Sequence, residues 1–186
     1  MAKYYFDIET YGPNLSPSPF TDKIITIQYQ PLDDTTGKPT GELVILKEWE
    51  SSEKDILLKF LPLLKKWEFI MVGNNLGYER RFLIEKARQI NWPNLNEYAL
   101  NYEFPAIDLQ SLFVILNEGK FKGSGMHNFT EKKMDGSKIK LWYEARDFAK
   151  IEEYVRDEAA GFIKLYCELS EKLPQLFPRK ERNKEI

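Results

Sequence analysis

Two carboxylates close to the start of the chain, Asp7 and Glu9, narrow the range of folds that it can adopt. They lie in or directly after residues 4–8, a segment rich in aromatic and β-branched side chains that predicts a strand. Alternate residues of a strand share a face, so the two carboxylates point the same way, with their Cα atoms roughly 7 Å apart. Burying both without a cation is costly, and hard divalent cations prefer carboxylate oxygens. The pair is therefore a candidate metal site, the alternative being a strand that ends at a solvated edge.

Composition indicates a soluble globular protein with a single core. The 186 residues, 42% apolar and 30% charged, suit one domain, which we assign to residues 1–177. Residues 178–186 are nearly all charged, and we expect this tail to fray. No segment approaches the run of about 20 apolar residues that spans a bilayer, so no membrane association is expected. The lone Cys167 fits a reducing compartment and predicts a cytoplasmic location.

The charge balance limits how the protein can meet a polyanion. A net charge of −2 argues against non-specific wrapping of nucleic acid. An acidic cleft that carries metal ions can nevertheless hold phosphates without a basic surface. Nucleic acid therefore remains a candidate ligand, provided that cations accompany it.

Strands are expected first along the chain. Residues 4–8, 24–30 and 42–49 each have strand-like composition. A loop with three prolines at residues 11–22 separates the first two, and a polar turn at residues 33–39 separates the last two, which predicts an antiparallel meander. Ser52, with Asp55 three residues on, then marks a helix start, and Pro62 is expected to shorten that helix.

Strands and helices then alternate. Residues 69–73 form a continuous apolar run typical of a buried parallel strand, and residues 78–89 are expected to form the helix that follows. A brief strand at residues 106–109 leads into a helix that ends at Leu116. Together these elements predict an α/β fold, a mixed five-stranded sheet with an antiparallel meander first and parallel strands after it, flanked by helices.

The last third of the chain is expected to be helical. We predict a short helix at residues 126–133 and a polar turn at residues 135–137. Asp147 is the expected N-cap of the longest helix, which should run to Leu173 and stop at Pro174.

Two later segments also carry acids next to predicted elements. Glu79 falls in the first turn of the helix that follows the buried strand, where the helix dipole alone favours an acid. Tyr154 and Glu158 are four residues apart on the last helix and share a face, and Asp157 lies close to that face. Each segment taken alone is equally typical of a solvated helix surface.

The three segments in this order resemble the exonuclease motifs of the DEDD superfamily. They are Phe-Asp-Ile-Glu-Thr at residues 6–10, Asn-Asn-Leu-Gly-Tyr-Glu at residues 74–79 and Tyr-Val-Arg-Asp-Glu at residues 154–158. Members of this superfamily are 3′–5′ exonucleases on a ribonuclease H-like fold and include the proofreading domains of DNA polymerases. The third motif contains tyrosine and no histidine, so the chain is similar to the tyrosine branch.

The resemblance implies which residues carry the chemistry. Asp7 and Glu9 match the first motif, and Glu79 takes the second-motif place, which is normally Asp. In the third motif, Tyr154 precedes the acid by four residues, which makes Glu158 the counterpart and leaves Asp157 as the alternative. These acids would hold two Mg²⁺ or Mn²⁺ ions, and the tyrosine would orient the attacking water. We also expect Thr10, Asn75 and Tyr78, which lie within the first and second motifs, to bind the substrate strand.

The function that this resemblance implies is hydrolysis of the terminal phosphodiester of single-stranded or frayed DNA. Two alternatives stay open. The Glu residues at the second-motif and third-motif positions suggest a catalytically weak domain that binds nucleic acid or a protein without cutting. A ribonuclease with the same acids is the other, because the sequence contains no evident reader of the 2′-hydroxyl. The sequence does not identify a polymerase or other protein partner.

Overall fold

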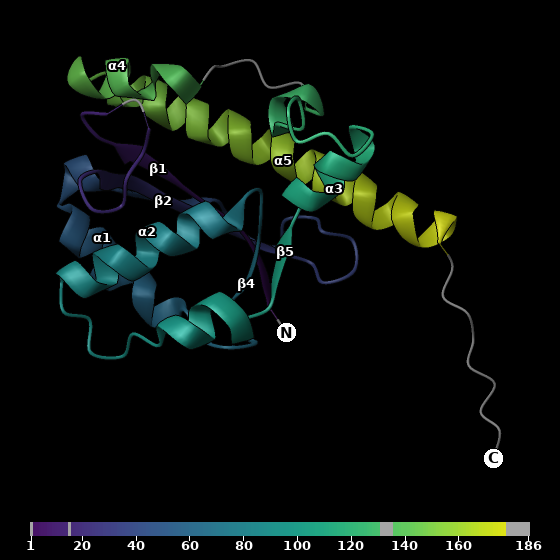
Figure 1. Cartoon of the computed structure of the whole chain (residues 1–186), viewed down its shortest axis with the longest axis horizontal. Coiled ribbons are helices and arrows are strands. Elements are labelled where there is room, and N and C mark those ends of the chain that lie inside the picture. Colours follow the sequence, from purple (N-terminus) through teal and green to yellow (C-terminus); the bar gives the residue numbers. More distant parts are fainter. Residues whose placement is uncertain (1, 15, 131–135, 178–186) are drawn as a thin grey trace.

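The computed structural model describes residues 2–14, 16–130 and 136–177, and these form a mixed sheet between two layers of helices (Figure 1). The strands are β1 (Lys3–Tyr11), β2 (Lys23–Leu32), β3 (Val44–Lys47), β4 (Ile70–Gly73) and β5 (Ala106–Asp108). Their order across the sheet is β3-β2-β1-β4-β5. Strand β2 is antiparallel to β1 and β3, whereas β4 is parallel to β1 and β5. The predicted five-stranded mixed sheet is therefore confirmed, with β1 at its centre.

Five α-helices lie in the part of the chain that the structure describes. They are α1 (Glu53–Phe60), α2 (Leu76–Gln89), α3 (Gln110–Leu116), α4 (Ile139–Glu144) and α5 (Phe148–Leu176). The Ser52 hydroxyl accepts a hydrogen bond from the backbone N–H of Asp55 at 3.1 Å, as the N-cap signature predicts. Pro62 lies in the 3₁₀ turn Leu61–Leu63 that ends α1.

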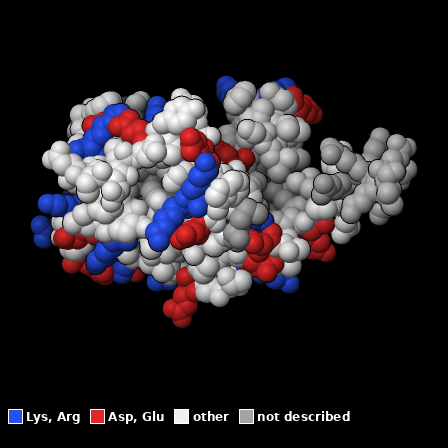
Figure 2. Space-filling model, turned by 90° about the horizontal axis from the view of Figure 1, so that it is seen from below, with Lys and Arg blue, Asp and Glu red and all other residues white. Residues whose placement is uncertain are grey.

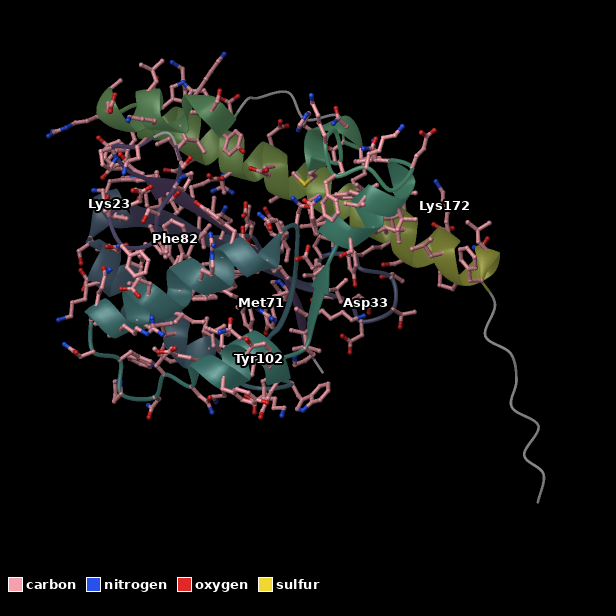
Figure 3. All side chains as sticks on the ribbon, in the orientation of Figure 1. Lys23, Asp33, Met71, Phe82, Tyr102 and Lys172 are labelled. Atoms are coloured by element: carbon pink, nitrogen blue, oxygen red, sulfur yellow. The ribbon has the colours of Figure 1, made fainter. Side chains whose placement is uncertain are left out.

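Alternation along β1 divides the interior into separate cores. Phe6 and Ile8 point to the face that α1 and α2 cover, in a core that also contains Met71 and Phe82 (Figure 3). Tyr5 points to the opposite face, where it packs against Phe162 of α5 with ring centroids 5.2 Å apart. Asp7 and Glu9 follow Tyr5 at spacing two, so they lie on the α5 side of the sheet.

Two predicted elements, the last helix and the third strand, differ from the structure in where they end. Helix α5 continues past the expected stop, and Pro174 lies inside it. The backbone N–H of Phe177 still donates to the Leu173 carbonyl at 3.0 Å, because a proline near a helix end removes only its own hydrogen bond. Strand β3 is shorter than residues 42–49, since Glu48–Glu50 turn into a 3₁₀ helix.

Helix α4 was not predicted, and the neighbouring segment is only partly described. Ile139 and Trp142 are its buried residues, and two positions are too few to display a helical period. Of the short helix expected at residues 126–133, the structure describes a 3₁₀ turn, Met126–Asn128. Residues 131–135 and the tail at 178–186 lie outside the described residues, so the proposed domain limits stay a prediction.

The surface shows no concentration of one sign of charge on the face in Figure 2, where acidic and basic side chains intermingle over the part that the structure describes. This agrees with the formal net charge of −2. Among the described residues, every helix is too short or too polar to cross a bilayer.

Candidate metal centre

Three carboxylates from the two ends of the chain meet above the centre of the sheet. Asp7 and Glu9 come from β1, and Glu158 comes from α5, which crosses that face of the sheet (Figure 1). One carboxylate oxygen from each lies within 4.8 Å of the other two. All three side chains are half-buried, so their mutual repulsion is not fully screened by water. The sheet and the long helix thus bring together residues about 150 positions apart.

The trio lines a cavity of about 320 Å³ that several other predicted residues share. Glu79, Tyr154 and Asn75 contribute to its wall, as does His127, the sole histidine. The cavity is large enough for hydrated ions or for the end of a polymer. Most of the polar groups on its wall are oxygen atoms that can act as metal ligands.

Glu79 is the most perturbed acid of the cavity. It lies in the first turn of α2 and its side chain is 5% exposed. Burial, together with the negative charge of Asp7, raises the pKa of the Glu79 carboxyl to about 9. It lies outside the group of three whose oxygens approach within 4.8 Å of one another. Near neutral pH and without a cation, Glu79 therefore carries a proton.

The donor set of the cavity fits a hard divalent cation. Among the described residues, Glu79 Oε2 and Asn74 Oδ1 are buried oxygen atoms without a hydrogen-bond partner, and both residues line the cavity. A buried acceptor without a partner is costly, and a cation would satisfy it. Together with the three clustered carboxylates, these atoms form an oxygen-rich set of the kind that Mg²⁺ and Mn²⁺ prefer.

Tyr154 is buried between the acids and α4. Its ring lies 6.2 Å from that of Trp142, and it is 4% exposed. Burial, followed by the charges of Glu9 and Glu158, raises the pKa of the Tyr154 phenol far above its ordinary value. Gly136 approaches its hydroxyl so closely that a Cβ there would lie 2.5 Å from the oxygen. The phenol is therefore held in place and stays protonated.

Asn75, Thr10 and Tyr78 hold the second motif against the sheet. Asn75 adopts a left-handed conformation with φ of 59°, and its backbone N–H donates to the Asp108 carboxylate at 2.8 Å. The Thr10 and Tyr78 hydroxyls lie 2.8 Å apart, and burial is the main cause that raises the pKa of Tyr78 to about 12. Of these three residues, only Asn75 lines the cavity.

Asp157 is directed elsewhere. It lines a separate depression on α5 with Phe129 and Lys164, because successive residues of a helix point about 100° apart. The structure thus brings Glu158, and not its neighbour, to Asp7 and Glu9.

Sequence reasoning missed two polar residues that support the site. Gln28, fully buried in β2, lies opposite Asp7 in the β1–β2 register and donates to its Oδ2 at 3.0 Å. The signal was available, since Gln28 is a polar residue within an apolar strand. Asp108 ends β5 and accepts from the backbone N–H groups of Asn75 and Leu76, which fixes the start of α2.

Comparison with solved structures identifies the fold. The chain is similar to E. coli exonuclease I in complex with a dT13 oligonucleotide, with a TM-score of 0.57 and 13% identity over 95% of this chain and 42% of that one. A zinc-bound form of the E. coli exonuclease I–single-stranded DNA complex gives a TM-score of 0.57 at 13% identity, with 96% of this chain and 41% of that chain covered.

A third solved structure is a family B DNA polymerase from the archaeon Pyrobaculum calidifontis. It matches with a TM-score of 0.64 and 18% identity over 94% of this chain and 25% of the polymerase. The chain spans less than half the length of each of these proteins. No family model matches the sequence, and no curated protein matches it significantly. The likeness therefore defines a class of fold, the ribonuclease H-like fold of exonucleases.

Proposed function

We propose that this protein is a metal-dependent 3′–5′ exonuclease of the tyrosine branch of the DEDD superfamily, acting on single-stranded or frayed DNA. The observation that carries the proposal is the approach of Asp7, Glu9 and Glu158 to within 4.8 Å of one another. The direction of cleavage and the choice of DNA rest on the motif resemblance, and the fold of exonuclease I is consistent with them.

The residues divide the work between holding cations and placing the reactants. Asp7, Glu9 and Glu158 would hold Mg²⁺ or Mn²⁺, with Glu79 joining as a ligand once it releases its proton. The bound cations supply positive charge that stabilises the reacting phosphate and acidifies water. Tyr154 keeps its proton, so it acts as a hydrogen-bond donor that orients an attacking water, and not as a base.

A degradation assay tests the proposal directly. End-labelled single strands of DNA are incubated with Mg²⁺ or Mn²⁺, and we expect stepwise shortening from the 3′ end. Asp7→Ala should reduce the rate by about a hundredfold or more, because it removes a ligand at the centre of the cluster. Asp157→Ala is the matched control on α5 and should keep the parental rate, since that side chain lines another depression. Equal rates for the parent and Asp7→Ala would refute the mechanism.

A second candidate function is binding of nucleic acid without cleavage. The specific observation in its favour is that Glu79 lies outside the cluster of three and has a pKa of about 9, so the fourth acid is not preformed as a charged ligand. Tight binding of the DNA strand with no shortening in either metal would support this candidate. RNA strands tested in parallel separate a ribonuclease from both.

A further inference from the structure

The Asp7 Oδ2 atom accepts hydrogen bonds inside the sheet from Gln28 and, at 3.5 Å, from the Tyr5 hydroxyl. Gln28 lies on β2 directly opposite Asp7, and its Nε2 donates to Asp7 Oδ2 at 3.0 Å. The side chain is fully buried, with none of its surface exposed. A fully buried amide is costly unless its hydrogen-bonding groups have partners.

A second residue holds the other end of this amide. Thr26 lies opposite Glu9 in the same register, is equally buried, and donates its hydroxyl hydrogen to Gln28 Oε1 at 2.9 Å. The ionised Asp7 carboxylate only accepts hydrogen bonds, so the NH₂ group must point at Asp7 and the amide oxygen faces the Thr26 hydroxyl. A flipped amide would place its oxygen against a carboxylate oxygen, which is repulsive.

The chemical type of the donor also matters. A neutral amide holds a carboxylate oxygen without neutralising it, so the full negative charge of Asp7 remains for a cation. A lysine or arginine at the same position would pair with Asp7 and compete with the metal. The negative charges of Glu9 and Glu158 repel the Asp7 carboxylate and favour its rotation away from them. The hydrogen bond from the amide opposes that rotation.

We propose that Gln28 is a positioning residue for the metal site, and that the chain Thr26–Gln28–Asp7 sets the orientation of the Asp7 carboxylate before a cation arrives. The inference rests on the proposed function, since it requires that Asp7 binds a metal. Outer hydrogen bonds of this kind typically change metal affinity by about 10–100-fold.

Titration of the purified full chain with Mn²⁺, followed by electron paramagnetic resonance, measures the effect without relying on activity. Gln28→Met keeps the size of the side chain and removes the donor, and we expect about 10–100-fold weaker Mn²⁺ binding. Thr26→Val should weaken binding less, because the Gln28 amide stays and loses only the hydrogen bond to its oxygen. Gln30→Met is the matched control, since Gln30 lies on the same strand and donates to the Gly41 carbonyl instead; its Mn²⁺ affinity should stay parental.

Thermal unfolding of each variant separates positioning from general damage. A purely structural role would lower the melting temperature of Gln28→Met and leave its Mn²⁺ affinity unchanged, which would overturn the inference while the proposed function stands. If the parent itself binds no Mn²⁺ in an Asp7-dependent manner, both the function and the inference fail. Should Gln28→Met not fold, Gln28→Asn shortens the side chain by about 1.5 Å and is expected to weaken Mn²⁺ binding in the same direction; parental affinity in that variant would overturn the inference.

Discussion

At the scale of single residues, the burial of a side chain affects its state of charge in this site more than the charge pattern of the sequence does. Asp7 and Glu9 were placed on one face by the two-residue period of a strand, which needs no knowledge of the fold. The burial of Glu79 was not predictable, because an acid in a first helical turn is equally favourable when exposed. Gln28 is visible in the sequence as a polar residue in a predicted strand, but its partner Asp7 is identified only once the β1–β2 register is known.

The raised pKa of Glu79 makes stability depend on pH. Its pKa is about 9 in the folded protein against a reference value of 4.5, so the folded state binds the extra proton between these limits. Metal-free protein must therefore lose stability as pH rises through this interval. Between pH 6 and pH 9, we expect the free energy of unfolding of the metal-free parent to fall by at least about 1 kcal/mol more than that of Glu79→Gln.

Urea denaturation in the presence of a chelator measures this prediction. Glu153→Gln on α5 is the control, because this side chain is exposed. A slope of stability against pH that is the same in the parent and in Glu79→Gln would contradict the assigned burial effect.

At the scale of elements, strands were easier to predict than short helices. The apolar runs in β2 and β4 were long enough to predict a strand from the sequence, whereas the six residues of α4 were too few to predict a helix. The predicted end of α5 was wrong because Pro174 was taken as a helix stop. A proline in the last turn of a helix removes only one backbone hydrogen bond and so destabilises the helix little. Helix α5 matters most, since it carries Glu158 and Tyr154 to the sheet.

Phe162 is expected to anchor α5 to β1. It lies one helical turn beyond Glu158, is 1% exposed and packs against Tyr5. Phe162→Leu should lower the free energy of unfolding by about 1–2 kcal/mol, because the smaller side chain leaves a cavity. Phe177→Leu, at the exposed end of the same helix, should stay within about 0.5 kcal/mol of the parent. Equal losses in urea denaturation would argue against this anchoring role.

At the scale of the whole molecule, the order of elements was enough to predict a mixed sheet flanked by helices, and the motif resemblance implied the ribonuclease H-like fold. Strands followed by strand–helix alternation leave few arrangements, and the mixed sheet is one of them. The convergence of β1, α2 and α5 on one cavity follows from that topology, since β1 is central and α5 crosses its face. What topology does not dictate is the depth of each acid, and therefore which of them is charged before a cation binds.

The most direct measurement is anomalous diffraction from a crystal soaked in Mn²⁺. We expect an anomalous peak within about 2.0–2.5 Å of carboxylate oxygens of Asp7 and Glu158, with Glu9 and Glu79 completing the set around it or a second ion. Mn²⁺ bound elsewhere, or no peak in this cavity while the crystal still diffracts, would contradict the claim that these acids form a metal centre.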